Sequence, residues 1–540
     1  MKIDLLEIRS RFKNLENVKI DFDEDHLMTV IVGRNGSGKS NVLEALVNIF
    51  RNLDLGESPP FSYFIKYKLG EGDEEGWIEI DADPERGTPA KQYQITVSTP
   101  GVELIESKSK VPISKVKRDK EGYSGYLPNY VFAYYSGPSD RLEKYFRRHR
   151  TEFYRKLLKN EIDLKGDIRP LFYAKPFHSQ FVLMAFFLSE GNQTEKEFLR
   201  EHLGIVGLDS IHFVMRKPGW SRPNDKNELF WGADGVVRDF LEALFPHVIA
   251  PLKVTRNEDV SLTGKNIRNE FFHLFLPNLE ALHDFADGLS ADVFFKMLES
   301  TLLSEIISEV NVRVQVASSK EPLTFKELSE GEQQLLTVLG LLKFTGGKDS
   351  LFLLDEPDTH LNPSWAVKYL ELLRQFVPNH QTSHLLMVTH HPLAIAELRK
   401  QQVQVMWADP DFQVHAQEPA ESPRGMGYGG ILTSDMFGLL STLDKKTERL
   451  LRLRRRFTEM DSLSTIKKGR LKKIDAAIES LGFTTAHWDR NYQEYLQARK
   501  KLSTEKIEQD SVKPDALKER KRIAARIVKS LNAKQENPSS

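Results

Sequence analysis

A glycine-rich stretch near the start of the chain has the composition of a phosphate-binding turn. It follows an apolar run, 28–32, and precedes a run with helical spacing, 41–47. Glycines let backbone N–H groups turn inward around a phosphate, and the next helix adds its positive dipole end. A Lys-Ser pair would then reach the β- and γ-phosphates and ligate Mg²⁺. The predicted ATP-binding residues are Gly33, Arg34, Asn35, Gly36, Ser37, Gly38, Lys39 and Ser40.

Two adjacent acids end an apolar strand in the second half of the chain. Asp355 and Glu356 directly follow the run 351–354. Asp355 is placed to hold Mg²⁺, usually through water, and Glu356 can polarise an attacking water. The plain alternative is a pair of acids that caps a strand. This alternative explains the two acids by themselves, but it does not explain why they occur in the same chain as a P-loop.

Two further motifs lie on either side of these acids. The first, Leu-Ser-Glu-Gly-Glu at 328–332, opens a helix with the hydroxyl of Ser329, which we expect to be free, and the backbone N–H of Gly331. Such a helix end can bind a γ-phosphate. The second is an apolar strand, 384–388, that leads to Thr389 and His390. In this order, the four motifs together predict one nucleotide site.

The elements between the motifs predict an α/β core with a parallel sheet, because short apolar strands alternate with helices. The first two strands, 2–9 and 18–22, should form a hairpin that delivers the chain to the P-loop strand. The clearest strands after the P-loop helix, which should end near Leu53, are 77–80, 93–97 and 130–135.

The periodicity becomes helical from about 141 to 310, and helical again past 430. No heptad pattern persists, so a long coiled-coil arm is not expected. One strand, 312–316, leads into the second group of motifs. The expected features of the helical parts are a capping box at 194–197, a strand at 271–276, and helices at 235–244, 293–310, 436–456 and 516–531.

The bulk composition indicates a globular chain of more than one domain: it has 540 residues, of which 40% are hydrophobic and 28% charged. The absence of cysteine excludes disulfides, thiolate catalysis and cysteine-based zinc sites, and fits a reducing cytoplasm. The start of the chain has no long apolar core, so no signal peptide is expected. The best apolar run, 181–188, is far short of a membrane span and predicts a buried helix. We therefore expect a cytoplasmic protein without a membrane partner.

The last hundred residues are basic. Residues 441–540 hold 25 Lys and Arg against 14 Asp and Glu, a net charge of +11, which leaves −12 for the rest because the whole chain carries −1. A basic tail on an acidic body favours an anionic partner such as DNA or RNA, or a docked subunit. A solvated helix face explains the charge equally well. The residues that could neutralise phosphates are Arg454, Arg455, Arg456, Lys467, Lys468, Arg470, Lys472 and Lys473.

The arrangement of the four motifs resembles ABC-type ATPases, in the branch that contains SMC, Rad-type, RecF and OLD-type proteins. The resemblance implies an SMC-like ATPase head with ATP and Mg²⁺ as cofactors, in which Glu356 and the switch histidine His390 are catalytic, and Ser40 and Asp355 bind the metal. It also implies a homodimer, or a higher even oligomer, in which Ser329 and Gly331 complete the ATP site of another copy.

Some family features are missing or altered. The family's metal-contacting glutamine, expected at the end of an N-lobe strand, is absent after the strand 130–135, and Gln94 has little support. His391 stands where relatives often have serine. Arg11 and Lys13 occupy the place of a basic nucleotide contact.

The resemblance sets the predicted domains. They are an ATPase N-lobe with the P-loop at 1–140, a mainly helical insert at 141–310, an ATPase C-lobe with signature, acids and switch histidine at 311–430, and a basic helical region at 431–540.

A narrower likeness, to bacterial Septu-type and retron-associated defence ATPases, rests on four stretches. It implies anti-phage defence and a separate HNH nuclease subunit (PtuB-like), with a retron reverse transcriptase and its nucleic acid as further partners. The stretches are 134–139, 230–235, 355–365 and 433–439.

Other functions stay open from the sequence. The alternative is a RecF- or Rad-like ATPase of DNA repair or chromosome maintenance, although the missing coiled-coil arm disfavours the Rad type. A transporter ATPase is disfavoured by the long insert and the Glu-rich signature, and a scaffold that uses ATP only to dimerise is a non-enzyme variant. No nuclease site is recognised. Asp409-Pro410-Asp411 has metal-site spacing, but its proline favours a turn.

Overall fold

The computed structural model describes residues 1–72, 75–99, 107–119, 123–161, 169–189, 193–221, 231–259, 266–439, 441–458, 465–481 and 522. The chain divides into two compact units, Met1–Ile395 with Gln401–Gln417, and Ala396–Lys400 with Glu418–Ser540. The first unit carries the sheets and the four motifs, and the second carries the C-terminal helices. Among the described residues, no helix has the length and apolarity to cross a membrane. The domain boundaries at 140, 310 and 430 stay a prediction.

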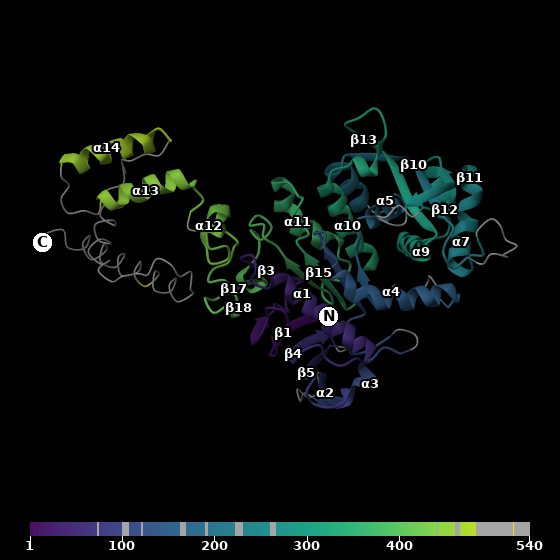
Figure 1. Ribbon diagram of the computed structural model, residues 1–540, viewed down its shortest axis with the longest axis horizontal. Coiled ribbons are helices and arrows are strands. Elements are labelled where there is room, and N and C mark those ends of the chain that lie inside the picture. Colours follow the sequence, from purple (N-terminus) through teal and green to yellow (C-terminus); the bar gives the residue numbers. More distant parts are fainter. Residues whose placement is uncertain are drawn as a thin grey trace. The chain divides into compact units, whose positions relative to one another are not determined.

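A seven-stranded sheet forms the centre of the first unit (Figure 1). Its order is β18-β17-β3-β16-β15-β8-β9, and every neighbouring pair is parallel except β17 and β18. All residues of the three strands that precede the P-loop, the paired acids and the switch histidine are buried, as two-sided burial of a parallel sheet requires. The strands are β3 (Met28–Gly33), β8 (Tyr130–Tyr135), β9 (Leu171–Tyr173), β15 (Ser350–Asp355), β16 (His384–Val388), β17 (Val403–Ala408) and β18 (Val414–Gln417).

The register of this sheet brings distant motifs to one edge. Asp355 lies opposite Val388 on one side and Tyr135 on the other, and Val388 lies opposite Ile31. Because the strands are parallel, their carboxyl ends meet at the same edge. The P-loop, Asp355 and Glu356, and His390 therefore leave the sheet side by side.

The P-loop helix α1 (Lys39–Leu55) packs against β3, β15 and β16. Alternate side chains of the strands, including Leu353 and Val388, share one core with α1 and with a second sheet. That sheet is antiparallel, in the order β2-β1-β4-β5-β6-β7. Its strands are β1 (Lys2–Ile8), β2 (Val18–Asp21), β4 (Tyr63–Leu69), β5 (Gly76–Ala82), β6 (Tyr93–Thr99) and β7 (Ser107–Val111).

The predicted hairpin, P-loop strand and N-lobe strands are confirmed, and β4 and β7 are additional. β4 alternates buried and half-buried residues as a strand of this sheet should, but its sequence mixes lysines with tyrosines, which weakens the polar-apolar contrast.

The described residues of the insert form both helices and strands, so the mainly helical insert stays a prediction, while the apolar run 181–188 lies in the buried helix α5 (His178–Leu188). The other helices of nine residues or more in the insert are α4 (Glu143–Leu158), α7 (Gly235–Leu244) and α9 (Ala291–Leu303). Shorter helical segments are α6 (Gln193–Glu197), which begins at the predicted capping box, η2 (Phe198–His202), η3 (Phe245–His247) and α8 (Leu279–Phe285).

A further antiparallel sheet, in the order β11-β12-β10-β13-β14, combines strands of the insert with residues 311–324 at the start of the predicted C-lobe (Figure 1). The sequence indicated only 271–276 and 312–316 of it. The predicted helix 293–310 is therefore wrong in its second half. It ends at Leu303, where Glu305 takes a positive φ of 67°, and the alternating pattern of 307–316 then forms a strand. The strands are β10 (Ile205–Arg216), β11 (Ile249–Asp259), β12 (Asn266–Leu276), β13 (Ile307–Val316) and β14 (Leu323–Thr324).

Two helices complete the C-lobe, α10 (Glu330–Thr345) and α11 (Pro363–Phe376), together with the short segments η4 (Phe325–Glu327) and η5 (Lys400–Gln402). α10 packs against α5 at Gly340, where an added Cβ would lie 2.1 Å from Val182 Cγ1. This close approach brings the start of α10, with its signature residues, toward the loop that follows β15.

The second unit contains α12 (Gly427–Thr433), α13 (Lys445–Thr458) and α14 (Thr465–Glu479), and the last two pack against each other. The single predicted helix 436–456 is wrong at its start. Asp444 caps α13, because its carboxylate accepts hydrogen bonds from the N–H groups of Lys446 and Thr447, so the helix begins after it. The predicted helix 516–531 lies outside the described residues, except for residue 522, and residue 230 of the stretch 230–235 also lies outside them.

Candidate nucleotide-binding site

The P-loop uses its glycines where no other residue fits. Gly33 has φ +144°, and an added Cβ would lie 2.0 Å from the carbonyl oxygen of Met406 on the neighbouring strand. Gly38, at the start of α1, has φ +89°, and its Cβ would lie 2.7 Å from Leu15 Cδ2. Both conformations are left-handed, and both backbones pass close to a neighbour. Arg34, Asn35 and Gly36 form the exposed tip of the loop, and Ser37 is buried.

A side chain from the first hairpin supports the loop from outside. Asn14 Nδ2 donates to the carbonyl oxygen of Gly36 at 2.9 Å, and Asn14 Oδ1 accepts from Asn41 Nδ2 at 2.6 Å. Nothing in the sequence predicts this contact, since an asparagine in a turn is ordinary. Of the two predicted basic contacts, Arg11 donates to the carbonyl of Lys13, and Lys13 pairs with the buried Glu44.

Lys39 folds back onto its own loop. Its Nζ donates to the carbonyl oxygens of Gly33 at 3.0 Å and Arg34 at 2.9 Å. Burial lowers the pKa of Lys39 to about 8, although Glu356 and Asp355 act in the opposite direction. The ammonium is thus close to the phosphate-binding turn and held only by neutral acceptors, which phosphate oxygens can replace.

Ser40 and Asp355 meet at the edge of the central sheet. Ser40 Oγ donates to Asp355 Oδ1 at 2.8 Å, and the fully buried Asp355 has no hydrogen-bond partner at Oδ2. Burial raises the pKa of Asp355 to about 6, an effect opposed by Ser40 and Arg141 and reinforced by Glu356 and Glu44. A hydroxyl beside a carboxylate oxygen without a partner fits Mg²⁺, which takes few protein ligands and the phosphates of a nucleotide.

No cluster of three or more His, Asp and Glu that could hold a metal occurs among the described residues. A site built from one serine and one aspartate is consistent with this finding.

Glu356 stands on a strained backbone. Its φ is +51°, a left-handed value that a non-glycine residue adopts at a cost. Its N–H donates to the carbonyl of Val388 at 2.8 Å, and its carboxylate lies 3.3 Å from His390 Nε2. Burial lowers the pKa of His390, and Lys39 lowers it further. A neutral imidazole therefore faces the carboxylate that is predicted to polarise water. His391 Nδ1 instead accepts from the N–H of Leu393.

Two buried polar contacts hold the loop after Glu356, and the sequence analysis missed both. Asp358 accepts a 2.6 Å hydrogen bond from the hydroxyl of Thr389, and burial raises the pKa of Asp358 to about 6. Gln334, on α10, donates to the carbonyl of Glu356 at 3.4 Å and accepts from the N–H of His360 at 3.2 Å. The only available signal was the place of Gln334 two residues after the signature motif.

The signature motif caps α10 as predicted, but its serine hydroxyl is not free. Ser329 Oγ donates to the carboxylate of Glu332 at 2.8 Å, and the same carboxylate accepts from the Ser329 N–H at 2.7 Å. The expected free hydroxyl is thus wrong, because a glutamate three residues after a serine N-cap closes a capping box. An added Cβ at Gly331 would lie 2.5 Å from the carbonyl oxygen of His360, so this glycine permits the close contact.

The sequence places Asp409-Pro410-Asp411 in a turn, and so does the structure. The segment joins β17 to β18, and Asp409 Oδ1 accepts from the N–H groups of Asp411 and Gln413. His415 Nε2 lies 3.0 Å from Asp409 Oδ2. Gln94, the weak candidate for a metal contact, lies on β6 in the antiparallel sheet and not at the edge that carries the P-loop.

Comparisons with known protein families return two matches to ATPase domains. Residues 1–163 match a family described as "AAA ATPase domain". Residues 226–396 match a family described as "AAA domain, putative AbiEii toxin, Type IV TA system". The first match includes the P-loop, and the second includes the signature, the paired acids and the switch histidine.

The chain is also similar to the Septu protein PtuA of Bacillus mycoides (strain KBAB4), with 25% identity over 200 residues. The match covers 35% of this chain and only 28% of the relative's length. Among solved structures, the SMC head domain from Thermotoga maritima aligns with 11% identity and a TM-score of 0.27, over 77% of this chain and 99% of the other. Stu0660 of Streptococcus thermophilus aligns with 10% identity and a TM-score of 0.27, over 91% and 99% of the two chains.

The two ATPase-domain matches and the Septu relative confirm the predicted resemblance to ATPases, and to PtuA among them. They agree with a P-loop, paired acids and a histidine that meet at one sheet edge. The chain therefore contains two segments similar to AAA ATPase domains and is similar over 200 residues to the Septu protein PtuA.

Proposed function

We propose that this chain hydrolyses ATP in a Mg²⁺-dependent reaction, as the ATPase subunit of a prokaryotic anti-phage complex in the cytoplasm. The observation that carries the ATPase part is the meeting of Ser40 with Asp355, next to Glu356 and His390. The P-loop residues 33–40 bind the phosphates, and Lys39 exchanges its two carbonyl acceptors for phosphate oxygens. This arrangement has the parts that phosphoryl transfer to water requires.

The catalytic roles follow from the geometry of the edge. Ser40 and Asp355 would hold Mg²⁺, which, when bound, neutralises charge on the phosphate oxygens. Glu356 accepts a proton from the attacking water, because its carboxylate is next to the phosphate loop and is oriented by its strained backbone. His390, held 3.3 Å away and neutral, fixes that carboxylate and contacts the γ-phosphate.

The ATP site is completed by another copy of the chain. In our proposal Ser329 and Gly331 act in trans on the γ-phosphate, in a homodimer or a higher even oligomer. Ser329 donates to Glu332 within its own helix, so phosphate binding must exchange this carboxylate for a phosphate oxygen. The N-terminus of α10 is suited to this exchange, since its dipole favours an anion.

We propose that the chain controls a separate nuclease. The support is the similarity to the Septu protein PtuA and the turn geometry of Asp409-Pro410-Asp411. The partner would be an HNH nuclease subunit (PtuB-like), with a retron reverse transcriptase and its nucleic acid as a further association. A RecF- or Rad-like repair ATPase is the alternative, and gene neighbourhood separates the two.

The pair of helices α13 and α14 is the proposed surface for DNA or RNA. The pair carries twelve basic side chains against three acidic ones. Arg454 Nε pairs with Asp475 Oδ1 at 2.7 Å and joins the helices, while Lys468, Arg470, Lys472 and Lys473 are exposed on α14. Exposed cations that outnumber acids on a paired-helix scaffold suit a phosphate backbone.

Hydrolysis and binding can be separated by two substitutions. Lys39→Ala should abolish ATP binding, because it removes the cation of the phosphate loop. Glu356→Gln should keep ATP binding and lower the turnover rate by at least about 100-fold, as expected for loss of a general base. Calorimetry of ATP binding and phosphate release measure the two effects. Turnover at the wild-type rate in Glu356→Gln would show that the base is another group.

Asp355→Asn tests the metal ligand through stability and pH. The pKa of Asp355 rises from 3.8 to about 6 on folding, so the folded chain holds this proton more tightly. The group therefore stabilises the fold at low pH and loses that contribution as pH rises from about 4 to about 6. At pH 8, Asp355→Asn should raise the free energy of unfolding by about 1–3 kcal/mol, and at pH 4 it should change little.

Urea unfolding at the two pH values, with and without Mg²⁺ and ATP, measures this effect. Asp411→Asn, at an exposed turn, is the matched control. Asp355→Asn should also lose the extra stability that Mg²⁺ and ATP give the wild type. If Asp355→Asn behaves as the wild type under all four conditions, Asp355 is not the metal ligand.

Ser329→Arg tests the trans assignment. An arginine at the start of α10 removes the capping hydroxyl and places a bulky side chain where the neighbouring copy should approach. ATP should still bind to the monomer, but ATP-dependent dimerisation of Glu356→Gln should disappear in the double variant, as measured by light scattering. Thr324→Arg, at the N-cap of the neighbouring turn η4, is a control for the loss of a cap. Normal dimerisation with Ser329→Arg would contradict the trans contact.

The partners are tested by capture of the native complex. The wild type should copurify a small HNH protein together with nucleic acid. Lys468→Glu with Lys472→Glu should lower the nucleic acid yield and reduce the salt slope of binding by about 2, because each phosphate contact contributes about 0.9. Lys320→Glu with Lys348→Glu changes two exposed lysines of the first unit, and it should leave the nucleic acid yield and the salt slope unchanged. Reproducible absence of a nuclease would favour the repair alternative.

A further inference from the structure

The edge of the central sheet holds an arginine that the four motifs do not account for. Arg141 lies between β8 and α4, where the chain leaves the strand that pairs with β15. The segment after β8 offers no glutamine that could reach the metal site, as the sequence already indicated. The first long polar side chain to approach the site from this segment is Arg141.

Arg141 is held against the P-loop helix. Its Nε donates to Glu44 Oε1 at 2.7 Å, and its Nη2 lies 2.7 Å from the same oxygen and donates to Asn41 Oδ1 at 3.0 Å. Asn41 directly follows the metal-binding Ser40, and Glu44 lies one helical turn beyond Ser40 on the same face. The guanidinium is thus next to the first turn of α1, within one residue of the predicted metal ligand.

Two further contacts place the guanidinium at the reaction edge. It lies 5.7 Å from the ring centre of Tyr135, and Tyr135 is the register partner of Asp355. Arg141 also lowers the pKa of Asp355 through its charge, while burial acts more strongly in the opposite direction. The side chain is about one quarter exposed, at 27%, so it is not locked in the core.

Glu44 can release Arg141 without losing its own neutralisation. Its side chain is fully buried, and its two oxygens have different cations: Arg141 contacts Oε1 and Lys13 contacts Oε2. A buried carboxylate without a cation would be costly, but Lys13 remains after Arg141 leaves. The hydroxyl of Tyr145 lies 3.5 Å from Oε2 and offers a further donor.

We propose that Arg141 is a γ-phosphate contact supplied by the same chain: when a nucleoside triphosphate binds, its guanidinium exchanges Glu44 and Asn41 for a terminal phosphate oxygen. The planar fork of arginine matches phosphate oxygens with two parallel hydrogen bonds, which neither a glutamine nor a lysine provides. This inference rests on the proposed function, since it assigns a residue to the same ATP site.

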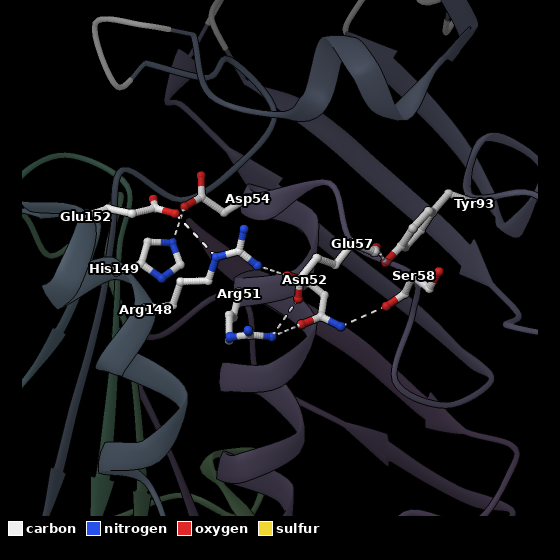
Figure 2. A network of polar contacts seen from close by, with 9 residues as sticks. All are labelled: Arg51, Asn52, Asp54, Glu57, Ser58, Tyr93, Arg148, His149 and Glu152. Carbon is white, nitrogen blue, oxygen red and sulfur yellow. Dashed lines mark hydrogen bonds and ion pairs between the residues drawn. The ribbon is translucent and has the colours of Figure 1, made fainter.

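The opposing explanation is that Arg141 only fastens α4 to α1. The structure contains a contact of that kind at the far end of α1, which is 17 residues and about 25 Å long. There, Arg148 pairs with Glu57 and Glu152, His149 Nε2 lies 2.5 Å from Asp54 Oδ2, and Arg51 and Tyr93 also contact Glu57 (Figure 2). Arg148, on α4, is therefore a matched control, because it pairs with Glu57 just beyond the end of α1, at the end of that helix away from the P-loop.

Calorimetric titration of the full chain with Mg-ADP and with Mg-AMP-PNP, a non-hydrolysable triphosphate, separates the two explanations. Arg141→Gln should raise the Kd for AMP-PNP by at least about tenfold, or about 1.4 kcal/mol, and leave the Kd for ADP within about twofold. Arg141→Lys, which keeps the charge but not the fork, should show a smaller loss that is also confined to AMP-PNP. Arg148→Gln should change neither affinity.

Each outcome has one meaning. Equal losses for both nucleotides, or no loss for either, would overturn the γ-phosphate contact and leave Arg141 as a fastener between helices. If Arg141→Gln does not fold, as judged by its melting curve, the nucleotide selectivity of Arg141→Lys decides in the same way. A wild-type chain that binds neither nucleotide would overturn the proposed ATPase function together with this contact.

Discussion

The hydrogen bond between Ser40 and Asp355 is the contact on which the site depends. It joins residues 315 positions apart in the sequence, and it exists because β3 and β15 are both parallel to β16. One strand that ran in the opposite direction would send its motif to the other edge of the sheet. The long insert between the two motifs is tolerated because the entropy of closing a loop grows only with the logarithm of its length. The order of strands in the sheet, more than nearness in sequence, therefore builds the site.

Burial of charge is the cost of this arrangement. Asp355 and Asp358 are both buried, and the pKa of each rises to about 6. Glu44 avoids this cost by pairing with two cations, and Asp358 is only partly compensated by the hydroxyl of Thr389. A site that concentrates carboxylates in this way is stabilised by a divalent cation, since the cation offsets the desolvation that the fold alone does not. The buried carboxylates that suit a divalent cation at this edge of the sheet therefore lower the stability of the fold without the cation.

The sequence predicted the edge well and its supporting contacts poorly. The motifs at 33–40, 355–356 and 390 each follow an apolar strand, and a run of buried residues that ends in polar ones identifies the carboxyl end of a parallel strand. Asn14, Arg141 and Gln334 carry no such pattern. Each acts through contacts to residues distant in the sequence, and nothing in the local spacing of a turn or a helix reveals which distant atoms its side chain meets.

The sheet of the insert was underestimated for a related reason. β11 is exposed at most of its described positions, so its apolar alternation is weak in the sequence. The helix predicted to run to 310 ends before Glu305, which takes a positive φ. Glutamate rarely adopts this conformation, so the residue type does not predict it.

Three groups suited to phosphate have acceptors within the chain itself. Lys39 donates to carbonyls of its own loop, Ser329 donates to Glu332, and Arg141 donates to Glu44. Ser329 is exposed and caps its own helix with Glu332. Lys39 is buried and Arg141 half-buried, and such donors are costly without an acceptor, so their internal acceptors stabilise the fold. They also compete with a phosphate for the same donors. In the proposed ATP complex, a triphosphate would displace the internal acceptors of all three donors, whereas a ligand without a γ-phosphate would displace only those of Lys39. The internal acceptors would therefore oppose the binding of a triphosphate more than the binding of a diphosphate, before any chemistry occurs.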